Sequence, residues 1–508
     1  MSKVDLPVKY RHAIITIFKV LLCALVVASF VYCVVINYPE TDFHFWGYVM
    51  FAALYLIVFL STANMYHCLN IGTLRKRELL FSFLFSTLLT NLIMYFVVSL
   101  LCKYIINPVP LLIMLVFQWI CGSIILLLAD HIYFQLRPVR DAIMICSADQ
   151  HETDSSLDKF KHVRESYKVR TIVSESEGID KLKRQISPFS TVIVGQIDPV
   201  IRHELVNYCF DNDKRMFIIP FIQDIIVHSS HQSFISDSVM YLCRNRPFTI
   251  EQLAIKRFFD ILISLLGLII CSPIMLIAAL CIKLQDGGPV FFKQERYTRN
   301  FKKFTLIKFR SMIVDAEKNG AQFTTENDDR ITPIGKILRI TRIDELPQFI
   351  NILRGEMSLV GPRAERIENV DFYCEMLPEF RFRMKVKAGL TGYAQVYGRY
   401  NTSYEDKLKL DLLYIENASI AEDLQLLFQT VRVLFVPRDS TAGFVPSSLE
   451  ELKTSLGHNL NKKDIICHVM LSILLHLYSK NSSKLDNHQI VVLYDFLILF
   501  NSSIFPPI

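Results

Sequence analysis

Two adjacent carboxylates, Asp344 and Glu345, stand close to three arginines, at Arg339, Arg342 and Arg363. A carboxylate can attack phosphorus only if its own charge and the charge of the phosphates are offset, so such a site needs a cation and arginine forks close by. These residue types therefore indicate phosphoryl transfer. The alternative is structural, with Asp344 as the N-cap of a helix and Glu345 as a surface acid in its first turn, since such pairs are common at helix starts.

Three sequence motifs contain or follow this pair. They are R-x-x-R-x-D-E-L-P-Q at 339–348, N-x-L-x-G-x-M-S-L-V-G-P-R at 351–363 and G-L-T-G-Y-A-Q-V-x-G-R at 389–399. With these motifs in this order and spacing, the segment 251–444 resembles the bacterial sugar transferases that start glycan assembly on a polyprenyl phosphate carrier, the monotopic phosphoglycosyl transferases.

The resemblance implies a role for each candidate residue. It makes Asp344 the nucleophile, Glu345 a ligand of Mg²⁺, and Arg363, which follows a proline, a rigid fork for phosphate. It extends substrate and phosphate binding to four more residues, Arg339, Lys308, Arg310 and Asp423. The alternatives are a surface ion pair for Arg363, a helix-dipole role for Arg339, a solvated strand edge for Lys308 and Arg310, and an N-cap for Asp423.

The resemblance also implies a reaction. In the family, the aspartate attacks the sugar-bearing phosphorus of a UDP-sugar, and the lipid phosphate then takes over the sugar phosphate. We therefore expect a phosphoglycosyl transferase that converts UDP-glucose or UDP-galactose and undecaprenyl phosphate into undecaprenyl-diphosphate sugar and UMP. This is the first membrane step of exopolysaccharide, O-antigen or capsule synthesis. The resemblance further implies Mg²⁺ as the cofactor and a homodimer, whereas no residue decides between the hexoses.

Two other functions stay open at this point. A non-catalytic membrane scaffold or regulator would be expected to have lost part of the acid pair or its arginines, and Asp344, Glu345, Arg339 and Arg363 are all present. A membrane-bound phosphatase or pyrophosphatase would use the same aspartyl chemistry with water as the acceptor. That reaction favours a wet site, whereas an anchor in lipid places the site against the bilayer.

The composition indicates a membrane protein. Of the 508 residues, 52% are hydrophobic and 37 are Phe, and the mean hydropathy is +0.32. The net charge of +6 suits a protein that rests on membrane lipid, and no basic stripe beside aromatic residues indicates a nucleic-acid partner. The twelve cysteines include no C-x-x-C pair, so we expect them to be reduced packing residues.

Four apolar stretches, near 13–37, 46–64, 79–102 and 109–130, are each long enough to cross a bilayer as a helix. Basic residues precede the first stretch, lie between the second and third, and follow the fourth, so both ends of this part are predicted to be cytoplasmic. The sequence therefore predicts a membrane α-helical bundle of four spanning helices at 1–137, in a bacterial cytoplasmic (inner) membrane.

The composition turns soluble at 138–246, where short β-rich runs alternate with polar segments. We expect a small α/β Rossmann-like domain with strands at 142–146, 169–173, 191–194 and 216–219. No glycine-rich turn follows the first strand, which favours a regulatory or oligomerisation role over nucleotide binding. The part 251–444 is expected to be an α+β catalytic domain with a re-entrant membrane helix, and the tail at 445–508 stays unassigned.

The predicted re-entrant helix, 258–282, is apolar and long enough to span. Basic residues flank it at both ends, led by Lys256 and Lys283, so either crossing direction would place one basic flank outside. Ser272 and Pro273 lie in its middle, where proline removes a backbone donor and serine can bond the freed carbonyl. We therefore expect a bend that keeps the catalytic domain on the cytoplasmic face. The alternative is a proline-kinked spanning helix.

Overall fold

The computed structural model describes residues 8–41, 44–136, 140–147, 167–243, 248–314, 316, 328–398 and 402–435. The unassigned tail at 445–508 lies outside these residues. So does Arg399, the last residue of the third motif.

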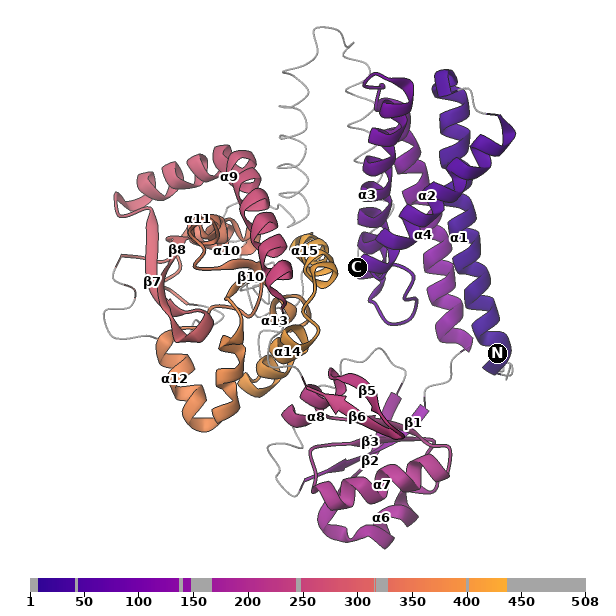
Figure 1. Cartoon of the computed structure of the whole chain (residues 1–508), viewed down its shortest axis with the longest axis vertical. Coiled ribbons are helices and arrows are strands. Elements are labelled where there is room, and N and C mark those ends of the chain that lie inside the picture. The colour runs from indigo at the N-terminus through magenta and orange to yellow at the C-terminus, as the bar shows by residue number, and fades with distance from the viewer. Residues whose placement is uncertain are drawn as a thin grey trace. The chain divides into compact units, whose positions relative to one another are not determined.

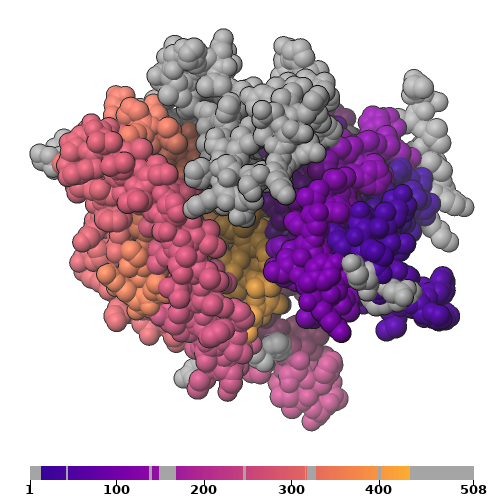
Figure 2. Space-filling model, turned by 90° about the horizontal axis from the view of Figure 1, so that it is seen from above, coloured from indigo at the N-terminus to yellow at the C-terminus, as the bar shows by residue number. Residues whose placement is uncertain are grey.

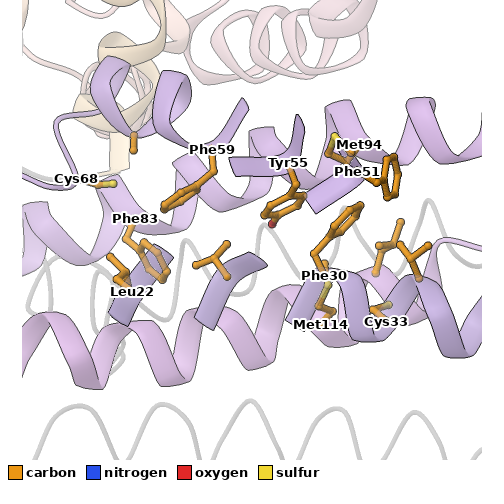
Figure 3. Packing of buried hydrophobic residues seen from close by; sticks show 14 of the residues in the cluster. Leu22, Phe30, Cys33, Phe51, Tyr55, Phe59, Cys68, Phe83, Met94 and Met114 are labelled. Atoms are coloured by element: carbon orange, nitrogen blue, oxygen red, sulfur yellow. The ribbon is translucent and has the colours of Figure 1, made fainter. Parts of the chain in front are cut away.

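Four long apolar helices form the N-terminal part, as the sequence predicts (Figure 1). They are α1 (Val8–Asn37), α2 (Phe45–Met65), α3 (Lys76–Cys102) and α4 (Val109–Leu136). Their core is rich in aromatic rings: Phe30 of α1 stacks on Tyr55 of α2 with ring centroids 4.1 Å apart, and Phe59 of α2 meets Phe83 of α3 edge to face (Figure 3).

A hydrogen-bonded polar cluster joins these four helices inside the bundle. Nε2 of Gln118 in α4 donates to the Val26 carbonyl of α1 at 3.0 Å, and its Oε1 accepts from Nδ2 of Asn91 in α3 at 2.9 Å. Oδ1 of Asn91 in turn accepts from the Tyr55 hydroxyl of α2 at 2.7 Å. Side-chain hydrogen bonds of this kind hold membrane helices together where the lipid supplies no hydrophobic driving force between them. The cluster therefore gives the bundle a defined packing.

The next part is a four-stranded parallel sheet in the order β2-β1-β3-β4. Each strand lies within two residues of its predicted position; they are β1 (Arg140–Cys146), β2 (Tyr167–Ser174), β3 (Thr191–Val194) and β4 (Arg215–Ile218). Helices α6 (Ile179–Ile186) and α7 (Pro199–Asp211) bury their apolar side chains against one face of the sheet. After the short helix α8 (Ile222–His228) comes an antiparallel hairpin of β5 (His231–Ile235) and β6 (Ser238–Leu242).

Helix α9 (Ile250–Asp286) contains the predicted bend residues. Figure 1 shows it as two arms that meet at a bend, and Figure 2 shows it at the surface in rose. The Ser272 hydroxyl donates to the Ile269 carbonyl at 2.8 Å, which is the carbonyl that Pro273, four residues on, leaves without a helical N–H. Within the described residues, α1 to α4 and α9 are the five helices long and apolar enough to cross a membrane.

The last part mixes short strands with helices. Its first element is an antiparallel hairpin of β7 (Phe291–Tyr297) and β8 (Lys303–Phe309). Helices α10 (Pro333–Thr341) and α11 (Gln348–Arg354) follow, joined by the 3₁₀ turn η4 (Ile343–Glu345). Strands β9 (Ser358–Val360) and β10 (Gly389–Thr391) pair in parallel. The remaining helical elements are α12 (Ile367–Met376), the 3₁₀ segment η5 (Pro378–Lys385), α13 (Tyr393–Tyr397), α14 (Tyr404–Glu416) and α15 (Ile420–Phe435).

Candidate active site

The acid pair lies in the turn η4, between two helices. Helix α10 ends at Arg342, which has a left-handed backbone with φ of 57°, and α11 begins after Pro347. Asp344 and Glu345 are both buried, with 9% and 7% of their surface exposed. The structural alternative for the pair is therefore wrong: Asp344 is no N-cap and Glu345 is no surface acid, because a left-handed residue and a proline occupy the two N-cap positions.

Two cations hold Glu345. Its Oε1 accepts from Nη2 of Arg363 at 3.0 Å and from Nζ of Lys308 on β8 at 3.3 Å. Burial alone would raise the pKa of Glu345, but the charges of Arg363, Lys308 and Arg342 outweigh it and hold that pKa below its ordinary value. Glu345 is therefore ionised at neutral pH.

Asp344 has a different environment from its neighbour. Burial, followed by the negative charge of Glu345, raises its pKa to about 6, against the opposing effects of Lys308, Arg339 and Arg363. Lys308 and Arg363 bond Glu345, and no residue in the described part of the chain donates a hydrogen bond to the Asp344 carboxylate. Asp344 thus has oxygen atoms free to react, beside a partner whose charge is already offset.

The loop 361–363 that carries Arg363 packs directly on the strand β10. The Gly361 N–H donates to the Thr391 carbonyl and the Gly389 N–H donates to the Pro362 carbonyl, both at 2.8 Å. A Cβ on Gly389 would lie 2.1 Å from the Gly361 nitrogen, and one on Gly392 would lie 2.3 Å from the Gly361 oxygen. Gly361, Gly389 and Gly392 are therefore required by the close approach of two backbones.

Two other basic candidates, Arg339 and Arg310, bond residues other than Glu345. Nε of Arg339 donates to the Ser311 hydroxyl at 2.8 Å, and its charge acts on Asp344. Arg310, just past the end of β8, pairs with Asp286 at the end of α9. Lys308 and Arg310 are 21% and 7% exposed, so the solvated strand edge is wrong for both. Lys308 and Arg339 therefore lie near the acid pair, whereas Arg310 is engaged elsewhere.

Comparison with known proteins matches this part of the chain to a family. Residues 251–437 match the family model described as bacterial sugar transferase. The exopolysaccharide production protein PSS of Rhizobium leguminosarum bv. phaseoli is 44% identical over 188 residues, which are 35% of this chain and 94% of that protein. The chain belongs to the bacterial sugar transferase family.

Two larger family members are also similar. The UDP-N-acetylgalactosamine-undecaprenyl-phosphate N-acetylgalactosaminephosphotransferase of Aeromonas hydrophila is 42% identical over 35% of this chain and 43% of its own length. The UDP-glucose:undecaprenyl-phosphate glucose-1-phosphate transferase of Klebsiella pneumoniae is 36% identical over 48% of this chain and 53% of its own length. The chain thus spans about half of the length of these two relatives.

Asp423 is not an N-cap, and its side-chain contacts within the described residues are with Lys256 and Tyr414 and not with the acid pair. It lies inside the first turn of α15, which is capped by Ser419, whose hydroxyl accepts from the Glu422 N–H at 3.2 Å. One oxygen of Asp423 pairs with Lys256 of α9, and the other accepts from the Tyr414 hydroxyl at 2.8 Å. The N-cap alternative is wrong because the helix begins three residues earlier, and Asp423 is occupied by two partners.

Sequence reasoning missed the buried ion pair of Arg383 and Asp411 in this domain. Arg383 in η5 and Asp411 in α14 lie 2.8 Å apart, and Nη2 of Arg383 also donates to the Arg363 carbonyl at 2.9 Å. Neither residue belongs to a motif or to an apolar pattern that would single it out. The sequence presents Lys256 as a basic residue in front of the apolar helix, and its contact with Asp423 is found only in the structure.

The acid pair fits the Mg²⁺ that the family resemblance implies. Magnesium is usually held by one or two carboxylates together with substrate phosphates, not by an all-protein cage. Within the described residues no three His, Cys, Asp or Glu side chains gather as a metal site. Glu345 is ionised, and among the described residues none donates a hydrogen bond to the neighbouring Asp344 carboxylate. Glu345 is thus the residue best placed to hold the ion.

Proposed function

We propose that this chain transfers a sugar-1-phosphate from a UDP-sugar to undecaprenyl phosphate, which gives undecaprenyl-diphosphate sugar and UMP. The observation that carries the proposal is the contrast between the two buried acids. Glu345 is held by Arg363 and Lys308, whereas no described residue donates a hydrogen bond to Asp344 beside it. A buried carboxylate without a hydrogen-bond donor, close to several cations, suits a nucleophile toward phosphorus.

In the first step, an Asp344 oxygen attacks the sugar-bearing phosphorus, and the bond from that phosphorus to the bridging oxygen breaks. The bridging oxygen leaves with UMP, and the sugar phosphate stays on Asp344 as an acyl phosphate. Mg²⁺ held by Glu345 and by the phosphates would offset charge on the diphosphate. Arg363, Lys308 and Arg339 supply fixed positive charge around the same centre.

In the second step, an oxygen of undecaprenyl phosphate attacks the same phosphorus and the Asp344 carboxylate leaves. The acceptor must reach the site from the bilayer. We propose that α1 to α4 span the membrane and that α9 is re-entrant, which seats the acid pair at the cytoplasmic face of a bacterial inner membrane. The bend of α9 and the bond from Ser272 to the Ile269 carbonyl support this arrangement.

The proposed donor is a UDP-linked hexose or N-acetylhexosamine. UDP-glucose and UDP-galactose follow from the resemblance. The names of similar proteins specify N-acetylgalactosamine in Aeromonas hydrophila, glucose in Klebsiella pneumoniae and galactose in Salmonella typhimurium. Glucose and galactose differ in the orientation of a single hydroxyl, which an enzyme distinguishes through contacts in its sugar pocket.

We also propose that the chain is a homodimer and that its Rossmann-like α/β domain serves oligomerisation or regulation. The hairpin of β5 and β6 supports this, because its apolar side chains are exposed, from Phe234 at 77% to Met240 at 49%. A two-stranded hairpin alone is marginally stable in water, and contiguous exposed apolar surface usually marks an interface. A second copy of the chain, with the same hairpin, is the partner that would cover it symmetrically.

A labelling experiment tests the transferase. Membranes that contain the wild type, Asp344→Ala or Glu375→Ala receive a panel of UDP-sugars labelled in the sugar, with Mg²⁺ or with EDTA. Glu375 is an exposed acid of the same domain and is the matched control. We expect label in the extractable lipid from one sugar, lost with Asp344→Ala and with EDTA and kept with Glu375→Ala.

Other outcomes of this experiment would overturn the proposal. Label released as free sugar phosphate would indicate a hydrolase. No turnover of any sugar by a folded protein with acceptor supplied would indicate a scaffold or regulator. Lipid labelling that survives Asp344→Ala would exclude the covalent step.

A further inference from the structure

The loop 361–363 is held at both ends through main-chain carbonyls. At the front, Nζ of Lys256 donates to the Val360 carbonyl at 3.1 Å. At the back, Nη2 of Arg383 donates to the carbonyl of Arg363 itself at 2.9 Å. The side chain of Arg363 then reaches Glu345. Two buried cations from distant parts of the chain thus hold the segment that carries the phosphate fork.

Each of these cations has a buried carboxylate partner. Lys256 pairs with Asp423 of α15, and the Tyr414 hydroxyl lies 2.8 Å from Asp423 and 3.2 Å from the Val360 carbonyl. Arg383 pairs with Asp411 of α14 and lies over the Phe380 ring, 4.8 Å from its centroid. The side chains of Arg383 and Asp411 are each only 1% exposed.

Stability alone does not account for two such pairs. Removing two charges from water costs as much as or more than their attraction returns, and well-packed apolar residues of similar volume often stabilise a protein equally well. What an apolar pair cannot do is donate to a carbonyl. Each of the two cations makes one such bond to a carbonyl, Lys256 to Val360 directly before the loop and Arg383 to Arg363 at its end. Buried partners of this kind fix the geometry of the residues that contact a ligand.

We propose that the pairs Lys256–Asp423 and Arg383–Asp411 are positioning residues that hold the loop 361–363 so that Arg363 meets Glu345 and the substrate phosphate. The inference rests on the proposed transferase function. It gives Asp423 a role different from substrate binding, because both of its oxygens are engaged by Lys256 and Tyr414. It also makes the first turns of the membrane helix α9, through Lys256, part of the support of the active site.

Paired substitutions separate positioning from stability. The variants are Arg383→Met with Asp411→Leu, and Lys256→Met with Asp423→Leu, each of which removes a whole pair and leaves no lone buried charge. The surface pair Lys181–Glu177, with side chains 63% and 29% exposed, is the control when changed to Met and Gln. We expect thermal midpoints close to the wild type, and kcat/KM lower by about 10- to 100-fold, the effect of a small misplacement of a catalytic group. The control should keep wild-type kcat/KM.

A double-mutant cycle with Arg363→Lys tests whether the pairs act through Arg363. Arg363→Lys keeps the charge and loses the fork. If the pairs position this fork, removing either pair in the Arg363→Lys background should lower kcat/KM by less than twofold. Full multiplication of the separate effects would overturn the proposal. So would wild-type kcat/KM in the paired variants.

Hydrogen exchange gives a readout that does not need activity. In the variant without Arg383 and Asp411, amides of the loop 361–363 should exchange faster than in the wild type, while those of α11 should not. Unchanged exchange in the loop would overturn the proposal even in a variant without turnover. If the wild type labels no lipid, the transferase proposal fails, whereas lipid labelling by the wild type together with unchanged loop exchange removes only the positioning role.

Discussion

Nη2 of Arg363 lies 3.0 Å from Oε1 of Glu345, and the same oxygen accepts from Lys308. Arg363 and Lys308 thus both bond Glu345, which stays ionised, whereas the part of the chain that the structure describes offers no hydrogen-bond donor to Asp344. Because burial and the Glu345 charge act together on Asp344, its pKa rises to about 6 while that of Glu345 falls. Adjacent carboxylates with opposite shifts suit two different roles in one reaction.

The raised pKa of Asp344 predicts an acid limb in the pH dependence of activity. Asp344 must be ionised to attack, so UMP release should fall by about tenfold per pH unit below pH 6. Lys308 lowers this pKa, so Lys308→Met should raise it and shift the limb to higher pH. Lys303→Met, an exposed lysine on the same strand, should leave the limb in place. A limb that does not move with Lys308→Met would contradict the assignment of the titrating group.

The acid pair and Arg363 could be predicted because they stand in continuous motifs. The conformation of the pair could not, since it depends on the left-handed backbone at Arg342, a position where non-glycine residues are uncommon. Strand alternation puts Lys308 and Arg310 on one face, but β8 ends at Phe309, and Arg310 turns to Asp286. The strands of the α/β domain follow local apolar patterns, which is why their positions agree with the sequence.

The contacts that support Arg363 lie beyond sequence reasoning for a physical reason. Arg383 meets the Arg363 carbonyl, and Lys256 meets Asp423, across long stretches of chain. Such contacts depend on the packing of several elements and leave no periodic or motif signal near either residue. Asp423 was predicted as a site residue from the family pattern, and its contacts are with Lys256 and Tyr414.

Asn351 is predicted to stabilise the support of Lys308. Its Oδ1 accepts from the Ile307 N–H at 3.1 Å and its Nδ2 donates to the Thr305 carbonyl at 2.7 Å, which ties α11 to β8. Asn351→Leu removes the partner of the buried Ile307 N–H and that of the partly buried Thr305 carbonyl. The free energy of unfolding should therefore fall by about 1–3 kcal/mol for the buried N–H group. Thermal unfolding of the detergent-solubilised protein measures it. Asn417→Leu, at an exposed residue, should have a small effect; an equal loss there would contradict the prediction.

Gly389→Ala should disturb the loop that carries Arg363. The new Cβ would lie 2.1 Å from the Gly361 nitrogen, and a backbone atom cannot swing away as a side chain can. The cost should be about 1–3 kcal/mol in unfolding free energy, with a loss of lipid labelling. Gly267→Ala in α9 is the control, since its nearest neighbour is the Phe349 ring at 3.0 Å, which can shift. Equal effects of the two substitutions would contradict the role of the interlocked loops.

The re-entrant form of α9 predicts that both of its ends lie on one side of the membrane. In a variant without the native cysteines, Glu251→Cys and Lys302→Cys should react with an impermeant maleimide in inverted vesicles only. Ile105→Cys, which is 83% exposed in the α3–α4 loop, should react from the opposite side.

Reaction of the two α9 positions from opposite sides would establish a spanning helix.

Pro273→Ala restores the N–H that can bond the Ile269 carbonyl, which removes the reason for the bend and for the Ser272 bond. A straight helix would have to carry the basic residues after Lys283 across the bilayer or leave the membrane. We therefore expect Pro273→Ala to reduce the amount of folded, inserted protein, whereas Ser272→Ala, which keeps the proline bend, should reduce it less.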